Sequence, residues 1–120
     1  MRRALRAFFE RGDFGVEEAD SASAALRHVA DGRPVDAVVS DVLMPGVGGV
    51  AFYDQLMELA PYLAHRVVFL TGAASDPRVH LPIEQRGVPL ISKLDDLRLV
   101  VDAVRLALLR RTAAVKVASE

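Results

Sequence analysis

The sequence of 120 residues contains no cysteine. Disulfide bonds and thiolate metal sites are therefore excluded. It also has no apolar run close to the ~20 residues that a membrane-spanning helix needs. The first residues, MRRAL, do not begin the apolar stretch of a signal peptide. These absences predict a cytoplasmic protein that does not enter a membrane.

The chain also has almost no net charge, with a formal value of −1 at pH 7. A nearly neutral chain has no overall field that would attract nucleic acid or an acidic membrane surface. Arginines gather near both ends, where solvated helix faces and a helix C-terminus account for them. Neither a nucleic acid nor a membrane is therefore expected as a partner.

Hydrophobic residues make up 52% of the sequence and follow two alternating periods. Short apolar runs typical of buried strands alternate with longer runs at helical spacing, which indicates a doubly wound α/β fold around a parallel sheet. The length predicts one domain. The predicted helices cover residues 2–11, 21–31, 50–60 and 96–111, with a short or irregular one within 75–87, and the predicted strands cover 15–19, 35–40, 67–70 and 88–92.

Three of the hydrophobic runs end in a polar side chain. Residues 38–49 read VVSDVLMPGVGG, a strand pattern that ends on Asp41 and continues into a Pro/Gly loop. Two later runs end in Thr71 and Lys93 in the same way. In a parallel sheet flanked by helices, the carboxyl ends of the strands line the crevice where ligands bind. An acid, a hydroxyl and an amine at that edge are the groups that an aspartyl-phosphate site uses.

Residues 38–49 resemble the phosphoacceptor segment of response-regulator receiver domains, the CheY-like family. Thr71 and Lys93 follow in that family's order and at about its spacing. The FLTG sequence at residues 69–72 is similar to receivers found at the ends of hybrid histidine kinases. The resemblance covers roughly residues 1–111.

The resemblance implies a flavodoxin-like receiver domain over residues 1–112. It implies that Asp41 accepts a phosphoryl group from a histidine kinase or phosphotransfer protein. It further implies that the Thr71 hydroxyl turns towards the phosphoryl group and that the Lys93 ammonium pairs with it. The domain would then switch a partner-binding face and have no independent enzymatic activity.

The sequence departs from the family at its start. Receivers begin with a hydrophobic strand that ends in an acidic pair, and the pair helps to hold Mg²⁺. This sequence begins instead with the pattern of the family's first helix. The remaining ligands implied for Mg²⁺ are Asp41 and the backbone carbonyl of Leu43, a weak set because this ion requires near-octahedral oxygen coordination. Leu94 and Leu90 also replace the proline and the aromatic residue that are common in receivers.

Residues 113–120, a tail with strand-like valines, offer one way to replace the missing strand. The tail of the same or a second molecule would then occupy the central position of the sheet, although Lys116 is badly suited to a buried strand. A homodimer could cover the gap instead, or the tail could be a linker.

Two other functions remain open. One is a phosphorylation-incompetent pseudo-receiver that serves as a protein-interaction or dimerisation module, which the absent acidic pair suggests. The other is a small doubly wound enzyme with Asp41 as base or nucleophile, although the sequence shows no second catalytic group beyond Thr71 and Lys93.

Overall fold

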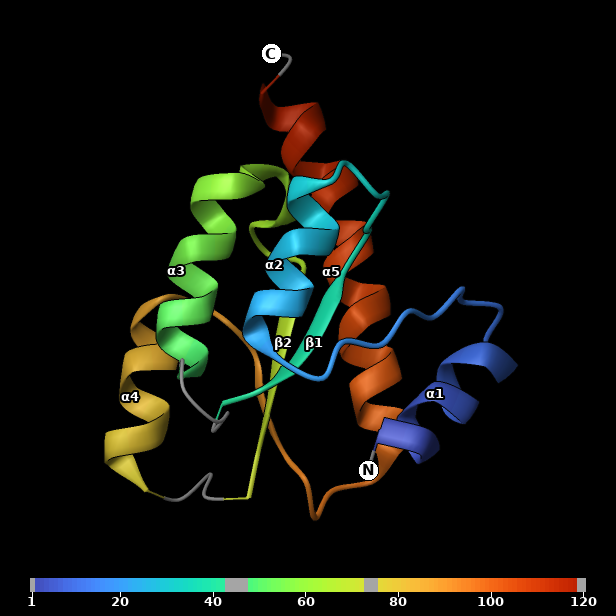
Figure 1. Ribbon diagram of the computed structural model, residues 1–120, viewed down its shortest axis with the longest axis vertical. Helices are drawn as coiled ribbons and strands as arrows, with labels where there is room; N and C mark the ends of the chain where they lie inside the picture. The colour runs from blue at the N-terminus through green and yellow to red at the C-terminus, as the bar shows by residue number, and fades with distance from the viewer. Residues whose placement is uncertain (1, 43–47, 73–75, 119–120) are drawn as a thin grey trace.

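A computed structural model describes residues 2–42, 48–72 and 76–118 (Figure 1). The chain folds into an α/β domain in which helices and strands alternate after the first two helices. The elements are α1 (Arg2–Arg11), α2 (Ala22–Ala30), β1 (Val38–Asp41), α3 (Gly49–Leu59), the 3₁₀ turn η1 (Pro61–Leu63), β2 (Val67–Thr71), α4 (Pro77–Gln85), β3 (Leu90–Ser92) and α5 (Leu97–Ala118).

The described sheet has three parallel strands in the order β1-β2-β3. Every residue of β2 is buried, as expected for a continuous apolar run covered on both faces. Side chains alternate across the sheet, so Val67 and Phe69 enter one core and Val68 and Leu70 the other. The predicted doubly wound parallel fold is confirmed, with three strands in place of the family's five.

Helices cover both faces of the sheet (Figure 1). The first core joins β2 to α2, α3 and α4 through Phe52, Leu56 and Ile83. The second joins it to α1 and α5 through Phe9 and Val100. None of the helices in the described ranges is long and apolar enough to cross a membrane.

The strand predicted at residues 15–19 does not form. This segment has no regular secondary structure and belongs to no sheet. A strand requires a hydrogen-bonding neighbour, and the family's first strand, which would separate residues 15–19 from β1, is missing from this chain. The local pattern alone was therefore not sufficient to form a strand at residues 15–19.

The described part of the tail is helical in this structure. Residues 113–118 continue α5, which runs from Leu97 to Ala118. No glycine or proline lies between Leu97 and Ala118, so nothing in the backbone ends the helix before it reaches the two valines. The described residues of the tail therefore add no strand to the sheet.

Gly49, the first residue of α3, lies in close contact with Val42, which directly follows β1. Its amide donates a hydrogen bond to the carbonyl oxygen of Val42 over 2.7 Å. A Cβ atom at Gly49 would lie 2.8 Å from both the Cα and the carbonyl oxygen of Val42, and 3.1 Å from the Phe69 ring. These neighbours are backbone and a buried ring, so they cannot move aside easily.

We expect Gly49→Ala to lower the free energy of unfolding by roughly 1–3 kcal/mol, because the added methyl group overpacks this contact. Urea unfolding measures the change. Gly15→Ala is the matched control, since a Cβ atom there meets nothing within 4 Å. Equal stability of the two variants would contradict the close approach of α3 to β1.

Asp54 of α3 and Arg86, which follows α4, form a two-point ion pair. Their N–O distances are 2.9 Å from Nε to Oδ1 and 2.8 Å from Nη2 to Oδ2. Arg86 also donates to the carbonyl oxygen of Pro82 over 2.9 Å. The hydrogen bonds from Arg86 are the main cause that lowers the pKa of Asp54. The pair therefore joins the middle of α3 to the C-terminal end of α4, two helices that cover the same face of the sheet.

Arg86→Met should lower the free energy of unfolding at pH 7 by at most about 1 kcal/mol, since Asp54 is half exposed. Because the folded pKa of Asp54 is lowered, its contribution is complete above the unfolded value near ~3.9 and is lost as the pH falls through the folded value. The difference between wild type and variant should therefore shrink between pH 5 and pH 2, which urea unfolding across that range measures. Arg27→Met, at an exposed position of α2, is the control. A loss that is independent of pH would assign the effect to packing of the Arg86 stem.

Candidate phosphoacceptor site

The three predicted site residues lie at the carboxyl ends of neighbouring strands. Asp41 is the last residue of β1, Thr71 is the last residue of β2, and Lys93 directly follows β3. Two hydrogen bonds align these ends: Val42 N donates to Leu70 O over 3.0 Å, and Lys93 N donates to Thr71 O over 2.9 Å. Asp41 and Thr71, 30 positions apart in sequence, and Lys93, 22 positions further on, therefore reach one edge of the sheet.

Asp41 and Lys93 form an ion pair across this edge. The Nζ atom of Lys93 lies 3.0 Å from Oδ1 of Asp41. The Lys93 side chain is 36% exposed, and the Asp41 side chain is 41% exposed. The carboxylate is therefore held beside a cation but can still be reached from solvent, as an incoming phosphoryl group would require.

Thr71 occupies the buried side of the same edge. It is 2% exposed and lies beside Ser92 in the register of β2 and β3. Its position in the sheet is fixed by the parallel pairing of β2 with β3. A hydroxyl group is thus held one strand away from the Asp41 carboxylate.

Ser92 contributes to the site in a way that the sequence pattern did not suggest. Its Oγ accepts a hydrogen bond from Leu94 N over 3.1 Å, and its carbonyl oxygen accepts one from Asp95 N over 3.0 Å. These bonds close the turn that presents Lys93 after β3. A serine hydroxyl often accepts a hydrogen bond from the backbone amide two residues further on, which favours a turn. The spacing of hydrophobic residues does not reveal such a bond. Leu94, in place of the family's proline, points into solvent and is 91% exposed.

The carboxylates of the described residues do not assemble a metal centre. In residues 2–42, 48–72 and 76–118, no group of three or more acidic, histidine or cysteine side chains lies close enough to hold an ion. The predicted carbonyl ligand, Leu43, lies outside the described residues. Within the described part, Asp41 is the one predicted Mg²⁺ ligand, and one carboxylate does not satisfy the octahedral oxygen coordination of Mg²⁺.

Comparisons with known proteins agree with this geometry. The sequence matches the family model of the response regulator receiver domain over residues 1–105. Response regulator Rre1 of Synechocystis sp. is 39% identical over 73 residues, which are 60% of this chain and 31% of that protein. The chain thus corresponds to less than a third of the curated relative's length.

Solved structures show the same fold. A response regulator receiver domain protein from Clostridium thermocellum aligns with a TM-score of 0.79 at 20% identity, covering 93% of this chain and 88% of that one. The structure of FixJ-N aligns with a TM-score of 0.75 at 24% identity, covering 88% and 82% of the two chains. Identities this low support the fold alone.

The chain belongs to the response regulator receiver domain family. It is therefore a receiver module of two-component signalling. Receiver domains interact with histidine kinases or phosphotransfer proteins and generally bind Mg²⁺ at the phosphorylation site. The described residues of this chain do not complete such a metal site.

Proposed function

We propose that Asp41 accepts a phosphoryl group from a phosphohistidine of a histidine kinase or phosphotransfer protein, in the cytoplasm, where ATP-dependent kinases have their substrate. The observation that carries this proposal is the Lys93 ammonium 3.0 Å from a partly exposed carboxylate at the carboxyl edge of the sheet. In a chain of this family, that edge is the place where phosphoryl chemistry would occur.

In the proposed reaction, an Asp41 carboxylate oxygen attacks the phosphorus atom. The new O–P bond forms as the N–P bond of the phosphohistidine breaks, and the electron pair of that bond returns to the imidazole nitrogen. The product is a mixed anhydride with more negative charge than the free carboxylate. Lys93 acts as a point charge that stabilises this added charge.

Thr71 has the second proposed role. Its hydroxyl, fixed at the end of β2, can donate a hydrogen bond to a phosphoryl oxygen once the phosphate is in place. Leu90, where other receivers carry an aromatic residue, is packed against the first core instead. We therefore propose that the output of the switch does not pass through an aromatic side chain on β3.

Incubation with acetyl phosphate and magnesium chloride should add one phosphoryl group to the chain, since acyl phosphates transfer to activated carboxylates. Intact-protein mass spectrometry measures the addition. Asp41→Ala should abolish it, while Asp95→Ala, which removes an exposed carboxylate near Lys93, should leave it in place. An unchanged mass of the wild type would contradict the proposal and favour a protein-interaction module.

Lys93→Met should slow phosphorylation by roughly tenfold or more, because a charge-assisted contact contributes about 1.5–3 kcal/mol. Its effect on the free energy of unfolding should stay below about 1 kcal/mol, since the ion pair is partly exposed. Lys93→Arg should retain part of the rate because it keeps the charge. Stopped samples analysed by intact mass give the rates, and urea unfolding gives the stability. A large loss of stability with an unchanged rate would assign Lys93 a structural role.

A further inference from the structure

The two peptide groups that flank Lys93 are both hydrogen-bonded. The amide of Lys93 itself donates to the carbonyl oxygen of Thr71 over 2.9 Å. The next amide, Leu94 N, donates to the hydroxyl oxygen of Ser92 over 3.1 Å. Because the planes of these two peptide groups set the direction of the Cα–Cβ bond between them, the two hydrogen bonds together aim the Lys93 side chain.

Ser92 begins a tight turn of four residues. Its carbonyl oxygen accepts a hydrogen bond from Asp95 N over 3.0 Å, which places Lys93 and Leu94 at the two central positions of the turn. Leu94 does not have a positive φ angle. This agrees with a type I turn, in which serine is a favoured first residue. Ser92 therefore closes the turn with its backbone and with its side chain.

Packing gives this turn little support. Leu94 is 91% exposed, and more than a third of the Lys93 side chain is open to solvent. Within the described part of the chain, the hydroxyl of Ser92 is the hydrogen-bond partner of the Leu94 amide. Without this hydroxyl the amide would bond to water, and the peptide group after Lys93 would lose its fixed orientation.

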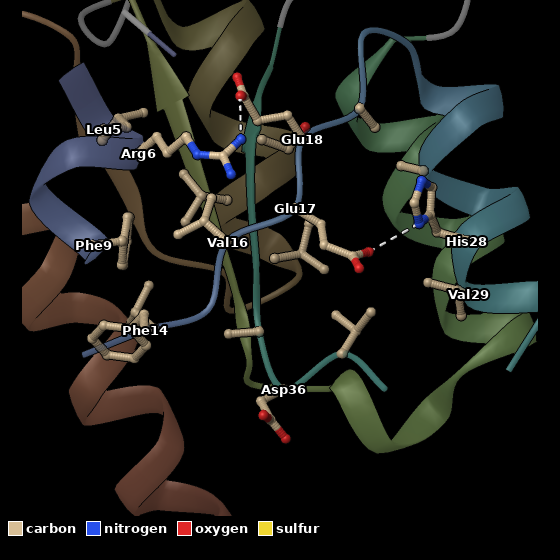
Figure 2. Close-up of a pocket in the computed structure, with 18 of the residues that line it drawn as sticks. Leu5, Arg6, Phe9, Phe14, Val16, Glu17, Glu18, His28, Val29 and Asp36 are labelled. Carbon is tan, nitrogen blue, oxygen red and sulfur yellow. Dashed lines mark hydrogen bonds and ion pairs between the residues drawn. The ribbon is translucent and has the colours of Figure 1, made fainter. Parts of the chain in front are cut away.

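Lys93 supplies the cation that pairs with the phosphoacceptor carboxylate in the described part of the chain. Two other basic side chains line the cavity of about 860 Å³ along β1, but each of them faces a glutamate. Arg6 pairs with Glu18 over 2.9 Å, and His28 lies 3.1 Å from Glu17 (Figure 2). Charge stabilisation at the carboxylate therefore depends on where the Lys93 ammonium lies.

A lysine side chain is flexible, so its direction has to come from the backbone. Holding such a side chain in one conformation costs conformational entropy. The attraction in a partly exposed ion pair is too weak to hold the two groups together by itself. The direction of the Cα–Cβ bond of Lys93 therefore decides how often the ammonium lies beside Asp41.

We propose that Ser92 is a positioning residue for phosphoryl transfer to Asp41. Its hydroxyl, through the amide of Leu94, holds Lys93 in the direction that places the ammonium beside the carboxylate. Ser92 does not touch the reacting atoms and acts through Lys93 alone. The inference rests on the proposed function of Asp41 and Lys93, and it adds that residue 92 affects the rate as long as residue 93 is a lysine.

Ser92→Ala should slow phosphorylation by acetyl phosphate and magnesium chloride by roughly two- to tenfold, the factor that a typical hydrogen bond contributes to an equilibrium. Intact-protein mass spectrometry of stopped samples gives the rates. Ser92→Thr should restore most of the rate, because the threonine hydroxyl can accept the same hydrogen bond. An unchanged rate in Ser92→Ala would overturn the proposal.

A double-mutant cycle separates positioning from a structural role. In the Lys93→Met background, Ser92→Ala should cause no further loss of rate, because the amine that Ser92 positions is absent. If Ser92→Ala slows the Lys93→Met chain as much as it slows the wild type, Ser92 has a structural role and the proposal is overturned.

Ser21→Ala is the matched control. The hydroxyl oxygen of Ser21 accepts a hydrogen bond from Ala24 N over 3.1 Å at the start of α2. This variant loses the same kind of bond and leaves the turn around Lys93 unchanged, so it should keep the wild-type rate. Urea unfolding gives the stability of both serine variants. Equal slowing of the two at equal loss of stability would assign the effect to stability and overturn the proposal.

NMR tests the positioning without phosphoryl chemistry. Lys93 and Lys116 are the only lysines of the chain, so selective ¹³C labelling of lysine gives two Cε signals. Asp41→Asn should shift the Lys93 signal in the wild type, because it removes the ion pair. In the Ser92→Ala background the same change should shift the signal by roughly half as much or less, since fewer molecules hold the amine beside the carboxylate.

Equal shifts in the two backgrounds would overturn the proposal. A wild type that acetyl phosphate does not modify, but that shows the unequal shifts, would contradict the proposed function of Asp41 and support the positioning of Lys93 by Ser92. The two proposals can therefore fail separately.

Discussion

The parallel pairing of β2 with both of its neighbours is the constraint on which the rest of the structure depends. β2 is enclosed by strands along both edges and by helices on both faces, and its five residues are buried throughout. A strand in that position cannot shift by one residue, because a shift would exchange the side chains that enter the two cores. The register therefore places the ends of all three strands at one edge, and with them Asp41, Thr71 and Lys93.

This constraint explains how a weak ion pair can have a defined geometry. A partly exposed pair such as Asp41–Lys93 contributes little to stability. Its position comes from the backbone: the sheet holds Asp41, and the turn closed by Ser92 holds Lys93. The Asp41 carboxylate and the Lys93 ammonium are therefore held together by the backbone and not by the strength of their own attraction. Stability and reactivity are thus supplied by different parts of the molecule.

The sequence predicted the parts of the fold that depend on local periodicity. The apolar runs before Asp41, Thr71 and Lys93 are strands because they are short, continuous and bounded by turns, and the family resemblance ordered them. Predictions that depended on a distant neighbour were less reliable. Residues 15–19 have no partner strand and form no regular structure, and the tail valines remain helical because nothing interrupts α5. The close contact of Gly49 with Val42 could not be read from a loop of several glycines, since only the packing distinguishes one from another.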